Sequence, residues 1–99
     1  MKILIVEDEV LVAENLSADL EDMGFKVVDI AISSDECFAS FDRYQPDVVL
    51  MDIRIKGELN GIEVANKLKE NSSTPIIYLT ANSDSETLQK AIESHPESF

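Results

Sequence analysis

The chain has 99 residues, of which 44% are hydrophobic and 28% charged, a composition that supports one small domain with its own core. Twenty acidic residues against eight basic ones give a net charge of −12, which argues against nucleic acid as a direct partner, because phosphate backbones require a basic surface. No apolar run approaches the roughly 20 residues of a membrane helix, and the first run is too short for a signal peptide, so we expect no membrane association.

Four short apolar runs are spaced along the chain, at residues 3–6, 27–30 (interrupted by Asp29), 48–51 and 76–79. Helical patterns of ten or more residues lie between these runs, and another helical pattern follows the last one. Strands that alternate with helices of this length favour right-handed βαβ crossovers and a parallel sheet. The sequence therefore predicts an α/β fold with four parallel strands.

The predicted helices cover residues 10–23, 33–44, 61 onward and 83 onward, and Ser33 and Ser83 each precede a glutamate by three residues, as in capping boxes. We expect the apolar side chains at helical spacing to face the sheet: Val12, Leu16, Leu20 and Met23 in the first helix, Ile62, Ala65 and Leu68 in the third, and Leu88, Ala91 and Ile92 in the fourth. Cys37, in the second helix, is interpreted as a buried small hydrophobe. One cysteine cannot form an intrachain disulfide, so the reducing cytoplasm is the expected location.

Polar side chains follow three of the four predicted strands. Glu7 and Asp8 come after the first strand, Asp52 after the third and Thr80 after the fourth. The third strand has apolar residues at consecutive positions, as expected when both faces are covered, so Asp52 must lie at its C-terminal end. The C-terminal ends of parallel strands share one edge of the sheet, where open α/β sheets bind their ligands.

Carboxylates gathered at this edge would repel one another by several kcal/mol unless a cation offsets their charge. Mg²⁺ is the obvious candidate, because it takes oxygen ligands and usually binds one or two carboxylates together with phosphate oxygens. A carboxylate beside Mg²⁺ can act as a nucleophile toward a phosphoryl donor, and the Thr80 hydroxyl could contact a phosphoryl oxygen. Alternatively, Glu7 and Asp8 belong to a solvated loop and Asp52 caps a turn.

Four segments of the chain, residues 3–9, 46–52, 60–63 and 75–81, resemble in their order and spacing the receiver domains of two-component response regulators. The resemblance covers essentially all of residues 1–99. It implies a flavodoxin-like, doubly wound sheet with strand order 2-1-3-4, to which this family adds a fifth strand and a fifth helix. We therefore expect a single receiver domain over residues 1–99 that is incomplete at its C-terminus.

The resemblance also implies a role for each residue at the strand ends. Asp52 is expected to be the phosphoacceptor, which takes a phosphoryl group from a histidine kinase or from acetyl phosphate. The resemblance implies that Mg²⁺ is held by Asp8 as a direct ligand, by Glu7 through water, by Asp52 and by the backbone carbonyl of Arg54. Thr80 is expected to be the switch hydroxyl. Its movement would change a protein-interaction face at the fourth helix, which a downstream effector protein or output domain recognises.

Two features depart from the family pattern. The loop after Asp52 lacks the usual proline and is one residue longer, and the lysine expected at the end of a fifth strand is missing. Lys90, the one lysine after the fourth strand, falls within the fourth helix and is predicted to be a solvated surface residue. Without a fifth strand, residues 76–79 would form an exposed apolar edge, so we expect self-association through it.

The sequence is therefore interpreted as a phosphoacceptor receiver, a signalling switch and not an enzyme beyond its own phosphorylation and dephosphorylation. The alternative is a receiver-like interaction module, or an inactive fragment, that does not transfer phosphate because the lysine is missing. A nucleotide-binding domain is less consistent with the sequence, because no glycine-rich loop follows the first strand. A metal-dependent phosphatase is also less consistent with it, because the 99 residues offer no obvious substrate-binding insertion.

Overall fold

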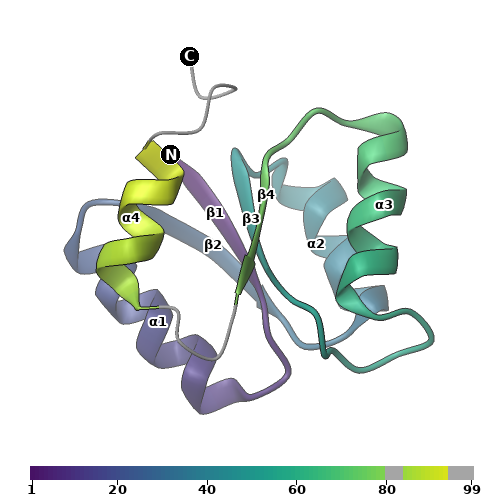
Figure 1. The fold of residues 1–99 in the computed structure, drawn as a ribbon, viewed down its shortest axis with the longest axis horizontal. Helices are drawn as coiled ribbons and strands as arrows, with labels where there is room; N and C mark the ends of the chain where they lie inside the picture. The colour runs from purple at the N-terminus through teal and green to yellow at the C-terminus, as the bar shows by residue number, and fades with distance from the viewer. Residues whose placement is uncertain (80–83, 94–99) are drawn as a thin grey trace.

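The computed structural model describes residues 1–79 and 84–93, within which four strands form one parallel sheet in the order β2-β1-β3-β4 (Figure 1). The strands are β1 (Lys2–Val6), β2 (Lys26–Ala31), β3 (Val48–Asp52) and β4 (Ile76–Leu79). The predicted α/β fold and strand order 2-1-3-4 are confirmed. Every crossover between neighbouring strands contains a helix, as a parallel sheet requires.

Helices cover both faces of this sheet (Figure 1). The helices α1 (Val10–Asp22) and α4 (Ser85–Glu93) pack on one face, and α2 (Ser34–Tyr44) and α3 (Gly61–Asn71) pack on the other. Ile3 and Ile5 of β1 lie in the core beside α1 and α4, whereas Leu4 and Val6 lie in the core beside α2 and α3. This alternation explains why β1 is apolar at consecutive positions.

Two residues predicted to face the core are instead exposed. Val12 in α1 is 47% exposed and Ile62 in α3 is 44% exposed. In α1 the inward stripe passes through Ala13 and Leu20, which places Val12 on its flank. In α3 the inward stripe passes through Val64, Ala65 and Leu68, and Ile62 lies about 60° around the helix axis beyond Ala65, outside the stripe. Ala91 of α4 is only half-buried, whereas the other side chains predicted to face inward lie in or against the core: Leu16, Leu20, Met23, Ala65, Leu68, Leu88 and Ile92.

The helix ends follow the sequence closely. Ser33 caps α2 by accepting a hydrogen bond from the Glu36 amide at 3.2 Å, as predicted. In α4 the Asp84 side chain accepts from the Thr87 amide at 2.7 Å, whereas Ser83, the predicted cap, lies outside the described residues. None of the helices in the described part of the chain is long and apolar enough to span a bilayer.

Cys37 is fully buried between α2 and the sheet, which confirms the predicted burial. Burial raises the pKa of its thiol to about 12. A thiol with this pKa carries almost no thiolate at neutral pH, so Cys37 is a packing residue and not a nucleophile.

Candidate functional site

The predicted acidic cluster forms at the C-terminal edge of the sheet. The parallel pairing of β1 with β3 places Val6 opposite Met51, so Glu7 and Asp52 follow on neighbouring strands. One carboxylate oxygen each from Glu7, Asp8 and Asp52 lies within 4.8 Å of the other two. The sheet topology therefore brings together side chains that are 45 positions apart in the sequence.

Backbone amides hold two of these carboxylates in position. Glu7 accepts a hydrogen bond from the Glu9 amide at 3.0 Å, and Asp52 accepts one from the Arg54 amide at 3.0 Å. Each bond closes a short turn just after its strand, which restricts how the carboxylate can rotate. Glu7 is only 6% exposed, whereas Asp8 and Asp52 are half-buried and accessible to a ligand.

The crowded carboxylates change the acid–base behaviour of Glu7. Burial raises its pKa to about 7, and a hydrogen bond with Asp52 and the negative charges of Asp52 and Asp8 act in the same direction. The Glu9 amide, which favours the ionised form, opposes them. At neutral pH, Glu7 in the metal-free protein is therefore protonated in a large fraction of molecules.

This donor set fits a hard divalent cation. Three carboxylate oxygens converge, and burial together with the neighbouring charges of Asp52 and Asp8 raises the pKa of Glu7, which is the behaviour of carboxylates held together without a cation. Mg²⁺ prefers such oxygen ligands, and binding it would require Glu7 to lose its proton. The observed cluster thus has the chemistry for the predicted magnesium site.

We expect Mg²⁺ affinity to increase with pH up to about 7, by roughly tenfold per pH unit, because one proton on Glu7 must leave. Calorimetric titration with Mg²⁺ at several pH values from about 5.5 to 8 measures this slope. Glu7→Gln is the control, since its side chain has no proton to exchange and its affinity should vary little. Equal affinity of the wild-type protein across that pH range would contradict the assignment.

The loop that leaves Asp52 is anchored where α3 begins. The Gly61 amide donates to the Ile53 carbonyl at 2.7 Å. A Cβ atom at Gly61 would lie 2.8 Å from Ile53 Cα and still closer to the Asp52 carbonyl oxygen. Only glycine allows the first turn of α3 to pack this closely against the backbone of Asp52.

The same loop is also tied to the turn between β2 and α2. The Lys56 amide donates to the Ile32 carbonyl at 3.2 Å, and the Ser34 amide donates to the Lys56 carbonyl at 2.9 Å. Gly57 has a φ of 106° and packs against the Ser34 hydroxyl, where a side chain would collide. The segment after Asp52 is thus fixed between α2 and α3.

Exposed apolar side chains occur on the segments that leave the acidic cluster. They are Val10, Leu11 and Val12 at the start of α1, Ile53 next to Asp52, and Ile62 at the start of α3. Leu11 is the most exposed of them, at 76%. Large apolar side chains in such positions are typical of surfaces that another protein covers.

The remaining residues singled out in the sequence, Arg54, Thr80 and Lys90, are not members of the acidic cluster found among the described residues. Arg54 is exposed, and its backbone amide, not noticed in the sequence, orients Asp52. Thr80 lies outside the described residues. Lys90 is exposed on α4, as predicted. Among the residues that sequence reasoning missed, Gly61 had a visible signal, a glycine at the start of a helix, but its contact with Asp52 depends on the fold.

Comparison with known proteins gives a consistent result. The family model described as "Response regulator receiver domain" matches residues 3–99. The chain is 34% identical over 95 residues to a protein-glutamate methylesterase/protein-glutamine glutaminase of Paramagnetospirillum magneticum, covering 95% of this chain and 27% of that protein. It is 33% identical over 100 residues to the DNA-binding response regulator MtrA of Mycobacterium tuberculosis, covering 99% and 42% of the two chains.

A solved structure extends the likeness to three dimensions. The BeF3-activated N-terminal receiver domain of RstA from Klebsiella pneumoniae matches with a TM-score of 0.77 and 28% identity, covering 94% of this chain and 78% of that one. The chain spans less than half the length of the curated relatives it matches.

Proposed function

This chain belongs to the response regulator receiver domain family, and we propose that it accepts a phosphoryl group on Asp52 from a histidine kinase. The observation that carries the proposal is the convergence of Glu7, Asp8 and Asp52 at one edge of the sheet. The half-buried Asp52 carboxylate, oriented by the Arg54 amide, is accessible to a phosphoryl donor. The chain would act as a signalling switch in a two-component system.

The reaction is a substitution at phosphorus. A carboxylate oxygen of Asp52 forms the new bond to phosphorus while the bond to the donor breaks, and the donor's histidine nitrogen or acetate oxygen keeps the electron pair. Glu7, Asp8, Asp52 and the backbone carbonyl of Arg54 would hold Mg²⁺, which supplies the positive charge that an anionic donor needs to approach. The Arg54 amide fixes the direction of the Asp52 carboxylate.

The product would carry a charge near −2 and new acceptor oxygens at the sheet edge. We assign Thr80, which follows β4 in the sequence, as the hydroxyl that donates to a phosphoryl oxygen. Thr80 is separated from α4 by a few residues, so its movement would shift the face of α4, where Glu86 and Lys90 are exposed. A downstream effector protein or output domain would recognise that face.

The exposed apolar side chains at the start of α1 and α3 support a protein as the donor. The apolar side chains of Leu11, Ile53 and Ile62 are exposed on the segments that flank the acidic cluster. A small donor such as acetyl phosphate is too small to cover these side chains, whereas a protein donor could. We propose that the histidine-bearing segment of the kinase covers this surface during transfer.

Incubation of the wild-type chain with acetyl phosphate and Mg²⁺, followed by intact-mass spectrometry, tests the proposed function. We expect a gain of one phosphoryl group that EDTA prevents and hydroxylamine removes, because hydroxylamine cleaves acyl phosphates but leaves serine and threonine esters intact. Absence of any gain would instead support the alternative of a receiver-like interaction module that does not transfer phosphate.

We further propose that the chain self-associates through β4. In the described part of the sheet, β4 pairs with β3 alone, and its Ile76, Ile77 and Tyr78 are half-buried. An unpaired edge strand of this kind can pair with another chain. Light scattering is expected to show a mass above that of one chain, and a stable monomer at all concentrations would contradict the proposal.

A further inference from the structure

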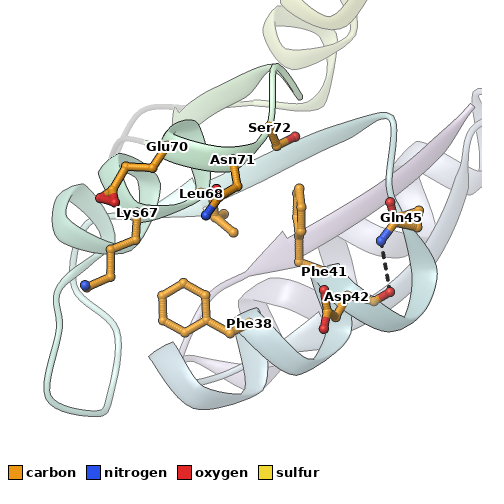
Figure 2. Close-up of a pocket in the computed structure, with 9 residues that line it drawn as sticks. All are labelled: Phe38, Phe41, Asp42, Gln45, Lys67, Leu68, Glu70, Asn71 and Ser72. Atoms are coloured by element: carbon orange, nitrogen blue, oxygen red, sulfur yellow. Dashed lines mark hydrogen bonds between the residues drawn. The ribbon is translucent and has the colours of Figure 1, made fainter.

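A groove separates α2 from α3 on the face of the sheet away from α1 and α4 (Figure 2). It has a volume of about 490 Å³ and includes Gln45 and Ser72, the residues at the C-terminal ends of the two helices. The acidic cluster lies at the C-terminal ends of the strands, whereas this groove lies toward the opposite end of the sheet. It is therefore separate from the proposed phosphoacceptor site.

Apolar side chains form the floor of this α2–α3 groove and part of its α2 wall, among polar residues. Phe38 and Phe41 project from α2 toward α3, and Leu68 of α3 lies between the helices (Figure 2). Phe38 and Phe41 each pack against the core on one side, but both are only half-buried, so part of each side chain is accessible from the groove. Their spacing of three residues gives a row of aromatic side chains along the α2 wall, which suits the apolar face of a third helix.

The rim of the groove is predominantly negative. Asp42 on α2 and Glu70 on α3 are exposed carboxylates, and Lys67 is the one cationic side chain among the lining residues. The C-terminal ends of α2 and α3 also add partial negative charge from their last carbonyls, which Arg43 and Lys69 in those last turns offset in part. The net charge of −12 on the whole chain disfavours anionic partners such as nucleic acid or acidic lipid at this groove.

We propose that the α2–α3 groove binds an amphipathic helix of a partner protein, whose apolar side chains pack on Phe38 and Phe41 while its lysine or arginine side chains pair with Asp42 and Glu70. This mode of recognition combines an apolar floor that gives affinity with rim charges that select a basic partner. The groove is an interaction surface in addition to the phosphoacceptor edge and the α4 face.

The test uses a helical peptide of leucine and lysine with its leucines on one face, titrated into the ¹⁵N-labelled chain at about 0.15 M salt. Its control is a peptide of the same composition in scrambled order, which has the same charge but no apolar face. We expect the helical peptide to shift amide resonances of residues around Phe38, Phe41 and Leu68, and the scrambled peptide to bind at least about tenfold more weakly.

Two double variants distinguish binding at the groove from non-specific attraction between a basic peptide and an acidic protein. Asp42→Lys/Glu70→Lys should weaken binding of the helical peptide by at least about tenfold, whereas Glu14→Lys/Asp19→Lys, with the same change in net charge on exposed positions of α1, should change it by less than about twofold. All four positions are exposed, so both proteins should fold.

Several results would overturn the proposal. These are equal losses in the two double variants, equal binding of the two peptides, shifts confined to other surfaces, and no shifts at peptide concentrations up to about 2 mM. Concentration-dependent shifts of the groove residues in the chain alone would also overturn it, because the occupant would then be a second copy of this chain.

Discussion

The Asp52→Asn protein is expected to gain no phosphoryl group from acetyl phosphate under conditions in which the wild-type chain gains one. The amide of asparagine has the same shape as the carboxylate but lacks the negatively charged oxygen that attacks phosphorus. Its oxygen can still accept the bond from the Arg54 amide, so the loop after β3 should keep its structure. The substitution therefore removes the nucleophile without removing the site around it.

Asp22→Asn, at the exposed end of α1, is the matched control because it makes the same chemical change far from the cluster. It should be phosphorylated at the wild-type rate, as followed by intact mass over time. Circular dichroism of both variants checks that the fold is kept. Continued gain of a phosphoryl group by Asp52→Asn at the wild-type rate would show that another residue is the acceptor.

Gly61→Ala is expected to destabilise the chain by about 2 kcal/mol, which lowers Tm by roughly 10 °C in a domain of this size. The new methyl group would meet the backbone at Asp52 and Ile53, which cannot move aside as a flexible side chain could. The start of α3 would have to shift and lose the hydrogen bond from the Gly61 amide to Ile53. Because the shift also displaces Asp52, phosphorylation should be slower.

Gly24→Ala is the comparison for this variant. Gly24 has a φ of 98°, so alanine is strained there, but no atom lies within 4 Å of the added Cβ. Gly24→Ala should lower the free energy of unfolding by about 1 kcal/mol and leave the rate of phosphorylation unchanged. Thermal unfolding followed by circular dichroism measures both variants. A Gly61→Ala protein as stable as the wild type, or more stable than Gly24→Ala, would refute the close-packing argument.

The sequence was sufficient to predict the architecture because β1, β3 and β4 have consecutive apolar residues, the apolar run of β2 is interrupted only by Asp29, and each crossover has helical spacing. The parallel sheet followed from the alternation of elements, whereas the strand order depended on the family resemblance. Val12 and Ile62 were placed wrongly because spacing alone does not fix the rotation of a helix about its axis. That rotation depends on contacts such as Gly61 with Asp52, which arise only in the folded chain.

Much of the acidic cluster was also predictable, since the C-terminal ends of parallel strands must share an edge. Glu7, Asp8 and Asp52 meet there as expected. The amides that orient Glu7 and Asp52 could not be predicted, because they depend on turn conformations that the residues do not specify. The backbone hydrogen bonds between Lys56 and the turn before α2 are likewise tertiary contacts, which no pattern in the local sequence indicates.

The most direct test of the central claim is to locate the phosphoryl group by chemistry. Borohydride reduces an aspartyl phosphate to homoserine, so treatment of the chain after incubation with acetyl phosphate and Mg²⁺ marks the acceptor permanently. Peptide sequencing by mass spectrometry then reads its position. We predict homoserine at position 52, and only when Mg²⁺ is present. Homoserine at position 8, the longer alcohol 2-amino-5-hydroxypentanoic acid at position 7 (the product expected from a glutamyl phosphate), or no reduced residue at all would contradict the assignment of Asp52 as the phosphoacceptor.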